Sequence, residues 1–496
     1  MNGIPSSLRW LVRATWSTAL CAAVAGCGSG GALAPNPPGS PGTAGPEVAQ
    51  WTTTGDRSRL LEAGSALAFA PAAAPLAQHV EVDASRRYQT MVGFGAAITD
   101  ATAWLLRHRM SAAQRDALMA ELFGRGPGGA GFDFTRLTIG ASDFSTEHYT
   151  FNDRPPGQSD LELAHFSIEK HRADLLPVVK QALAVNPRLT IMASPWSAPA
   201  WMKTNDSLIK GSLRPDRYEV FSRYLVRYLE SYAAEGVPIH ALSLQNEPHF
   251  EPGDYPGMRL EAAGRAAIFG QHLGPMLERK GLKVMLIDWD HNWDEPASPL
   301  AVLADPVARR YVNGVGWHCY VAEHHLANQT VVHEAHPDKD TWFTECSGGE
   351  WKPVFAEALM ATSRNIVIGS TRGWARGVLM WNLALDENHG PHLGGCKDCR
   401  GLVTIDSATG AVTRTAEYYA LAHASRFVRP GAQRIESTGL TGSIRSVAFR
   451  NADDGSIVLV ASNQATSEQR FSIGFEGRVV QASLPRESLS TFVWRP

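Results

Sequence analysis

Two glutamates in this sequence, Glu247 and Glu345, each stand at the end of a short apolar run. Glu247 follows "LSLQN" and precedes Pro248, so a strand-like segment ends in two carboxamides, a carboxylate and a proline. A charged side chain at the end of a buried strand costs solvation free energy unless it is paired or used. Glu345 ends the run "TWFTE" in the same way. Each glutamate alone is also compatible with an ordinary surface turn, so the elements that position the pair must decide.

Those elements alternate between strand and helix. Short apolar runs are followed by longer segments of helical period, such as residues 102–124, 217–236 and 416–428. The strand-like runs cover residues 91–98, 134–140, 189–194, 239–245, 282–288, 313–319, 341–345 and 377–384. Repeated strand–helix units of this kind predict an α/β fold, a (β/α)8 TIM barrel over residues 91–428. The fourth and seventh strands end across one barrel mouth, so Glu247 and Glu345 are expected to face each other.

The chain ends follow a different pattern. Residues 429–496 contain short alternating segments separated by turns, such as "IRSVAFRN" and "GSIVLVASN", which predict a β-sandwich. Residues 51–90 carry "ALAFAP" and "HVEVDA", which are expected to add N-terminal strands to the same sandwich. Both chain ends would then build one side domain next to the barrel.

More polar and aromatic residues are predicted at the barrel mouth, because chemistry in this fold occurs at the carboxyl ends of the strands. The predicted ends carry Thr99 and Asp100, Asp143 and Phe144, Pro195 and Trp196, Asn246, Asp288 and Trp289, His318 and Tyr320, and Trp381 and Asn382. Carboxylates and carboxamides bind sugar hydroxyls, and flat rings pack against a pyranose. Retaining hydrolysis of a glycosidic bond needs two carboxyl groups about 5 Å apart. The pattern therefore predicts a carbohydrate site centred on Glu247 and Glu345.

Composition narrows the remaining classes. The net charge of −3 and the pI near 6.6 give no electrostatic footprint for nucleic acid. No internal run is long enough to span a bilayer. We expect no cofactor, no metal and a monomeric protein.

The N-terminus has the pattern of a targeting segment. Arg9 and Arg13 precede the apolar stretch "ATWSTALCAAVAG", which suits a signal peptide over residues 1–26. The stretch ends in "VAGC", which resembles a bacterial lipoprotein signal with Cys27 as the lipidated residue. Residues 27–50 are rich in Gly and Pro and predict a flexible tether. We therefore expect an exported, membrane-anchored bacterial lipoprotein; the alternative is an ordinary cleaved signal peptide.

Four cysteines lie beyond this segment, at positions 319, 346, 396 and 399. The short spacing of Cys396 and Cys399 in "GCKDCRG" allows a disulfide in an exported protein. A single CxxC pair is weak evidence for zinc, so we expect a structural loop, bridged or not.

Several segments together resemble glycoside hydrolase family 30, the family of the lysosomal glucosylceramidases and of microbial β-1,6-glucanases. They are "GFGAAITDA", "ASDFS", "ASPWSAPAWMKTN", "QNEP", "WHCY", "FTECSGG" and "WNLALDENHGPH", and the similarity runs from about Trp51 to the C-terminus. The resemblance implies a retaining mechanism with Glu247 as general acid/base and Glu345 as nucleophile.

The resemblance also implies roles for the surrounding residues. Asn246 would bind the 2-hydroxyl of the sugar at the cleavage point. Tyr320 and Arg136 would hold the charge of Glu345, while His318 would support the acid/base side. The implied substrate-binding set is Asp143, Phe144, Trp196, Asn246, His318, Tyr320 and Trp381, with Arg136 and Asp100 in support. In this arrangement Glu345 is expected to be ionised, whereas Glu247 is expected to have a raised pKa and to hold a proton.

The substrate and some alternative functions stay open. A β-linked glucose is expected at the cleavage point, with either ceramide or a 1,6-linked glucan as the leaving group. The segments at residues 290–294 and 386–406 look more like the glucanases than the animal glucosylceramidases, and a β-xyloside is not excluded. A non-catalytic sugar-binding lipoprotein would have no need for both glutamates. A metal enzyme is a further alternative, because histidines lie close together in sequence without a ligand spacing, at positions 318, 324, 325, 333 and 336.

The lipoprotein expectation is directly testable at Cys27. Cells that express the protein with labelled palmitate should yield a labelled, membrane-bound product. Cys27→Ser should lose the label and be released or stay unprocessed, because the thiol that carries the lipid is gone. A wild-type protein that is unlabelled and freely soluble would contradict the expectation.

Overall fold

The computed structural model describes residues 45–71 and 74–496. The expected signal peptide, Cys27 and most of the expected tether lie outside the described residues. Strand β1 (Glu47–Thr54) begins before residue 51, so the tether boundary expected at residue 50 is wrong and the first strand starts earlier. Among the helices in the described ranges, we find none with the length and apolarity to cross a membrane.

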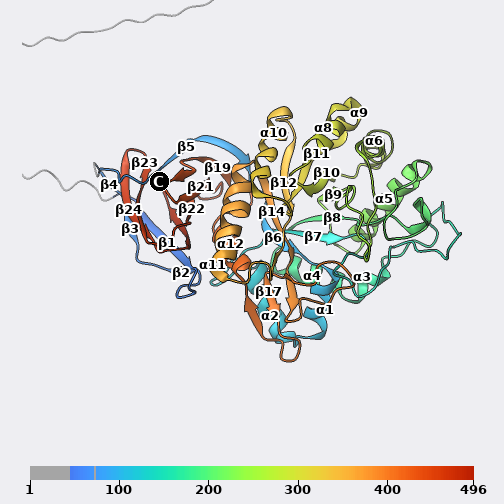
Figure 1. Cartoon of the computed structure of the whole chain (residues 1–496), viewed down its shortest axis with the longest axis horizontal. Coiled ribbons are helices and arrows are strands. Elements are labelled where there is room, and N and C mark those ends of the chain that lie inside the picture. The colour runs from blue at the N-terminus through green and yellow to red at the C-terminus, as the bar shows by residue number, and fades with distance from the viewer. Residues whose placement is uncertain (1–44, 72–73) are drawn as a thin grey trace, which may run out of the picture. The chain divides into compact units, whose positions relative to one another are not determined.

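Residues 93–382 contain a closed barrel of parallel strands (Figure 1). Its strands, in order around the ring, are β6 (Gly93–Ala97), β7 (Phe134–Thr138), β8 (Thr190–Ser194), β9 (Ala241–Ser243), β10 (Met285–Asn292), β11 (Val312–His318), β12 (Asp340–Glu345) and β14 (Ala375–Asn382). Each predicted strand-like run contains or overlaps one of them. The predicted (β/α)8 barrel is therefore confirmed.

The inside of the barrel is packed with side chains rather than hollow. Its core consists of fully buried residues from six strands: Phe134, Met192, Ala241, Ile287, Trp342 and Leu379. The close approach of β6 to β7 requires a glycine at position 95, because a Cβ there would lie only 2.0 Å from the carbonyl oxygen of Phe134. Apolar runs that are buried on both faces are what a parallel barrel requires.

Helices surround the strands, and a capping motif in the sequence marks where one of them begins. The α-helices are α1 (Asp100–His108), α2 (Ala112–Phe123), α3 (Glu169–Ala173), α4 (Leu175–Val185), α5 (Tyr218–Ala234), α6 (Ala262–Ala267), α7 (Gly274–Lys280), α8 (Ala297–Ala304), α9 (Pro306–Tyr311), α10 (Asn328–Ala335), α11 (Phe355–Ala361) and α12 (Ala416–Ser425). Helix α11 continues into a π-helical segment, η5 (Thr362–Ser370). The helical run expected over residues 102–124 is two helices, because Ser111 caps α2 in a capping box with Gln114.

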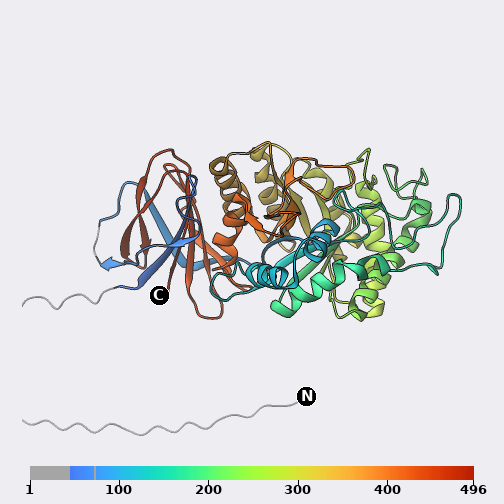
Figure 2. The same ribbon diagram turned by 90° about the horizontal axis from the view of Figure 1, so that it is seen from below.

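The side domain is a β-sandwich built from both chain ends, as expected. Its strands are β1, β2 (Glu62–Ala63), β3 (Leu67–Ala68), β4 (Ala70–Pro71), β5 (His79–Thr90), β19 (Gln433–Ser437), β20 (Leu440–Thr441), β21 (Ile444–Arg450), β22 (Ile457–Asn463), β23 (Gln469–Phe475), β24 (Arg478–Leu484) and β25 (Ser488–Trp494). Strand β1 pairs with β25 from Val48 to Thr54, and β5 lies between β19 and β23. Figures 1 and 2 show these blue and red strands side by side.

A buried histidine joins helix α12 to this sandwich. The His423 ring lies 2.9 Å from Thr491 Oγ1 through Nδ1 and 2.9 Å from Thr53 Oγ1 through Nε2. The Thr491 hydroxyl donates to the His423 carbonyl, so Nδ1–H donates to Thr491 and Nε2 accepts from Thr53. Burial, with a smaller effect from the charge of Arg426, lowers the pKa of His423 to about 3. This contact therefore requires a neutral imidazole.

Acid should weaken the folded state through His423. Its folded pKa lies below the unfolded value, so the stabilisation is complete above about pH 6.5 and is lost as pH falls toward 3, by about 1.4 kcal/mol per pH unit. His423→Gln keeps a hydrogen-bonding side chain without a proton to take up. Urea unfolding between pH 6.5 and 4.5 should show a shallower loss of stability for this variant, with the exposed His324→Gln as control. An unchanged pH slope would contradict the assignment.

Candidate active site

The carboxyl ends of the barrel strands surround a cavity of about 560 Å³, the active-site cavity. Glu247 and Glu345 both line it, as do Asp143, Trp196, Asn246, Tyr320 and Trp381. Strand β10 adds His291, and the segments that follow β9, β12 and β14 add Phe250, Tyr255, Trp351, Cys396 and Cys399. The structure thus brings the two glutamates and most of the expected substrate-binding residues to one cavity.

A fully buried arginine from β7 connects the residues around this cavity. The Arg136 Nη1 donates to Glu345, and Nη2 donates to Asn246 Oδ1 and Asp290 Oδ2, both at 2.7 Å. Its Nε donates to Ser194 Oγ at 3.2 Å. The guanidinium also lies over the Trp196 ring, 4.9 Å from its centroid. Because its partners include two carboxylates, Arg136 stays charged despite complete burial.

Glu345 is held from both oxygens. Arg136 binds Oε2, and the Tyr320 hydroxyl donates to Oε1 at 2.8 Å. The residues next in sequence to this pair, Cys319 and Cys346, form a disulfide with a Cα–Cα distance of 5.3 Å. The bridge joins the ends of β11 and β12 next to the Tyr320–Glu345 contact. The sequence did not predict this bridge, although Cys319 is the last residue of one predicted strand and Cys346 directly follows another.

Glu247 stands in a strained turn. Its φ angle is +50°, a region that few residues other than glycine adopt, and its N–H donates to the carbonyl of Asp290 at 3.0 Å. Strain of this kind costs of order 1 kcal/mol or more and persists where the surrounding structure imposes it. The turn aims the carboxylate at two imidazoles: Oε1 is 3.0 Å from His318 Nδ1 and 3.4 Å from His291 Nδ1.

The imidazoles reverse one electrostatic expectation. Burial raises the pKa of the Glu247 carboxyl, but the nearby His291 ring and the hydrogen bond and charge of His318 outweigh burial and hold that pKa well below its usual range. The raised pKa expected for Glu247 is therefore wrong for this arrangement. Burial also raises the pKa of Glu345, and the charges of His318 and Arg136 offset this only in part.

The neighbouring His318 has a raised pKa instead. Burial lowers the pKa of His318, but the charge of Glu345 and the hydrogen bond to Asp290 contribute to raising it to about 9. Its Nε2 lies 3.1 Å from Asp290 Oδ1. Glu247 and His318 therefore form one hydrogen-bonded pair that carries a single proton near neutrality.

Asp290, rather than the expected Asp288, serves the site. A bulge interrupts the pairing of β10 with β11 between Trp289 and His291, and both Trp289 and Asp290 have positive φ angles. The bulge re-aims the side chains that follow it. Asp288 therefore pairs with Arg265 at 2.8 Å outside the barrel, and Trp289 packs there too, whereas Asp290 reaches Arg136 and His318.

Three expected site residues do not line the cavity. Phe144 is fully buried behind Trp381, with ring centroids 6.3 Å apart. His318 is also fully buried and contacts Glu247 from behind the cavity wall. Asp100 accepts hydrogen bonds from Ser145 and Tyr149 and so supports the loop that carries Asp143. Phe144 and His318 are therefore corrected from substrate contacts to residues that support the pocket from behind.

The sugar-facing wall consists of two stacked indoles and a carboxyl group. The Trp196 and Trp381 rings are stacked, with centroids 4.9 Å apart. Burial, followed by the charge of Glu345, raises the pKa of Asp143 well above its usual range. Cys396 and Cys399 form a disulfide with an S–S distance of 2.03 Å, and their loop closes this side of the cavity.

Within the described ranges, one group has metal-ligand residue types at chelating separation: Glu247, His291 and His318, whose ligand atoms lie within 4.8 Å of one another. The histidines at 324, 325, 333 and 336, expected as alternative ligands, are not part of it. One of these imidazoles, that of His318, already forms a hydrogen bond with the Glu247 carboxylate.

Comparison with known proteins agrees with this geometry. Residues 91–428 match the glycosyl hydrolase family 30 TIM-barrel domain, and residues 431–492 match the glycosyl hydrolase family 30 beta sandwich domain. The chain therefore belongs to glycoside hydrolase family 30 and is a glycosyl hydrolase, as the sequence motifs implied.

Relatives of two specificities are similar to this chain. An endo-1,6-beta-D-glucanase of Neurospora crassa is 35% identical over 422 residues, which cover 82% of this chain and 86% of that protein. The lysosomal acid glucosylceramidase of Mus musculus is 28% identical over 444 residues, covering 83% and 82%. The solved structure of an endo-beta1,6-glucanase matches with a TM-score of 0.82 at 32% identity, over 90% of this chain and 100% of that one.

Removing the charge of each aspartate of β10 in turn should distinguish the role of Asp290 from that of Asp288. Asp290→Asn keeps the shape of the side chain but removes the anion that Arg136 and His318 share. NMR titration should show the pKa of His318 falling by about one unit or more. The matched variant Asp288→Asn removes an equally buried carboxylate that faces Arg265 instead, and it should leave the His318 titration in place. Equal shifts in both variants would contradict this description.

Proposed function

We propose that this protein is a retaining β-glucosidic hydrolase with Glu345 as nucleophile and Glu247 as general acid/base. The observation that carries the proposal is the position of both carboxylates in one cavity, with Arg136 binding Glu345 and Asn246 together. Glu345 attacks the anomeric carbon, the glycosidic C–O bond breaks, and Glu247 protonates the leaving oxygen. Water, deprotonated by Glu247, then hydrolyses the glycosyl–Glu345 ester.

The Glu247–His318 pair supplies the proton for the first step. A proton that moves from His318 Nδ1 to Glu247 leaves two neutral groups, and the acid then donates to the leaving oxygen. After this donation Glu247 is an anion next to a neutral imidazole, which is the state that a general base requires. Asp290 keeps the His318 ring oriented through Nε2 in both states.

Binding of the glucosyl ring is assigned to the residues opposite the acid. Trp196 and Trp381 contact the apolar parts of the ring, and Asp143 exchanges hydrogen bonds with its hydroxyls. Asn246 donates through its amide to the 2-hydroxyl, because its carbonyl oxygen already accepts from Arg136. This contact strengthens in the oxocarbenium-like transition state.

We propose a β-1,6-linked glucan as the substrate, cleaved within the chain. Support comes from the endo-1,6-glucanase relative at 35% identity and from the matching endo-glucanase structure, against 28% for the mouse glucosylceramidase. The half-exposed aromatic side chains Phe250, Tyr320 and Trp351 around the cavity offer stacking surfaces for further sugars. Hydrolysis of glucosylceramide is the competing outcome of the substrate test below.

The two carboxylates should give different products with azide. Glu345→Gly should lose turnover by about 10⁴-fold or more, and azide should restore reaction on an activated aryl glucoside to give the inverted α-azide. Glu247→Ala should keep the first step on such substrates, since protonation is dispensable there, and azide should give the retained β-azide. If Glu345→Gly gave the β-azide and Glu247→Ala gave the α-azide, the two roles would be reversed.

Early products should identify mechanism and substrate together. Proton NMR of the first minutes of hydrolysis should show the β-anomer, since the nucleophile and water approach from opposite faces in turn. A panel of β-1,6-glucan, glucosylceramide, aryl β-glucoside and aryl β-xyloside should show the highest kcat/KM on the glucan. An α-anomer would overturn the retaining mechanism, and a preference for glucosylceramide or the xyloside would overturn the substrate.

A further inference from the structure

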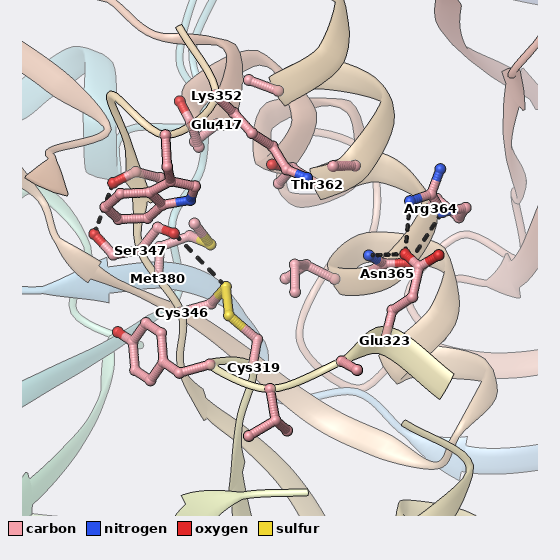
Figure 3. Close-up of a pocket in the computed structure, with 18 of the residues that line it drawn as sticks. Cys319, Glu323, Cys346, Ser347, Lys352, Thr362, Arg364, Asn365, Met380 and Glu417 are labelled. Atoms are coloured by element: carbon pink, nitrogen blue, oxygen red, sulfur yellow. Dashed lines mark hydrogen bonds and ion pairs between the residues drawn. A yellow bond between two sulfur atoms is a disulfide. The ribbon is translucent and has the colours of Figure 1, made fainter. Parts of the chain in front are cut away.

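A second cavity of about 660 Å³, the side cavity, adjoins the active-site cavity (Figure 3). The two share Tyr320 and Trp351 among their lining residues. The Cys319–Cys346 disulfide, which flanks the Tyr320–Glu345 pair in sequence, also lines the side cavity. Apart from the shared Tyr320 and Trp351, none of its lining residues has a role proposed above.

The side cavity combines an apolar floor with a flat aromatic wall. The disulfide and the buried Met380 form part of the floor. Trp351 is 49% exposed, which is unusual for a side chain of this size and leaves a ring face open. An open indole next to apolar atoms is a surface on which a sugar ring stacks.

The polar groups of the side cavity fall into a satisfied set and an unsatisfied one. On one side Glu323 accepts from Arg364 at 2.6 Å and from Asn365 at 2.8 Å, so these three bind one another. On the other side, where Figure 3 shows Lys352 and Glu417, hydrogen-bonding capacity is left over.

Glu417 is the stronger of the two signals. It is only 3% exposed; Oε1 accepts from Arg400 at 3.0 Å, while Oε2 has no hydrogen-bond partner among the described residues. A buried acceptor without a partner costs free energy, which a ligand hydroxyl would recover. Lys352 is exposed at the rim, and its ammonium makes no ion pair within the described part of the chain.

The balance of charge selects the kind of ligand. The lining carries two cations, Lys352 and Arg364, and two anions, Glu323 and Glu417. A charged ligand would meet as much repulsion as attraction, whereas a neutral polyhydroxylated ring would use the carboxylate, the ammonium and the indole together.

We propose that the side cavity is a subsite for a further glucosyl unit of the glucan chain, beyond the sugars at the cleaved bond. The proposal rests on the proposed glucanase function. Trp351 stacks against the ring, Glu417 Oε2 accepts from one hydroxyl, and Lys352 donates to another. Long chains that reach both cavities then bind better than short ones, which favours cleavage inside the chain.

The test fills the side cavity without touching the active-site cavity. Ala361 lines the side cavity from the end of α11, and Ala361→Trp places an indole in it. Glu357→Trp adds the same side chain on the exposed face of the same helix and is the matched control. Each protein is assayed on an aryl β-glucoside and on β-1,6-linked gluco-oligosaccharides of two to eight units.

Ala361→Trp should lower kcat/KM about tenfold on the longer oligosaccharides and leave the aryl glucoside unchanged, whereas Glu357→Trp changes neither. Lys352→Ala, an exposed substitution that leaves the core alone, should show the same chain-length dependence if Ala361→Trp fails to fold. A loss that is equal for all substrates, or no loss in either variant, overturns the subsite while the function stands. A wild type that cleaves the aryl glucoside but no 1,6-linked oligosaccharide overturns the proposed substrate and the subsite with it.

Discussion

The charge of Arg136 has to be neutralised inside the barrel, and the arrangement of the site follows from that requirement. An isolated buried guanidinium would cost several kcal/mol, so it needs both counter-charges and hydrogen-bond acceptors. The structure supplies Glu345 and Asp290 as anions and Asn246 and Ser194 as neutral partners. These partners come from the ends of four other strands or the turns that follow them. One cation thereby sets the relative positions of Glu345, the proposed nucleophile, and Asn246, the residue proposed to bind the 2-hydroxyl.

Neutralisation by Asp290 in turn depends on irregular backbone. A regular strand would place Asp290 on the same face as Asp288, which is the outer face. The bulge and the positive φ angles at Trp289 and Asp290 break that alternation, and the Glu247 N–H bonds to the Asp290 carbonyl. The two strained turns therefore support each other: one aims the acid, and the other aims the carboxylate that orients His318.

The proton of the acid is shared as a further consequence. Glu247 meets two imidazoles, and His318 meets Asp290 on its far side. Opposite charges at these distances favour the ionised carboxylate and the protonated ring. The proposed general acid is thus better described as the Glu247–His318 pair than as a carboxyl group with a raised pKa.

Periodicity and local motifs were enough for the sequence to determine the barrel, the sandwich made from both chain ends, and the strand ends that carry Glu247, Glu345, Asn246, Asp143 and Trp196. These features depend on neighbours along the chain and on the rule that strand ends meet at one mouth. The sequence did not determine that Asp290 rather than Asp288 contacts the site, or that Phe144 and His318 lie behind the cavity wall. It also did not determine that Cys319 and Cys346 form a disulfide. Each of these depends on a bulge or on contacts between strands far apart in the chain, which local pattern does not encode. The resemblance already implied that His318 supports Glu247, but only the tertiary structure added His291 and gave the direction of the Glu247 pKa.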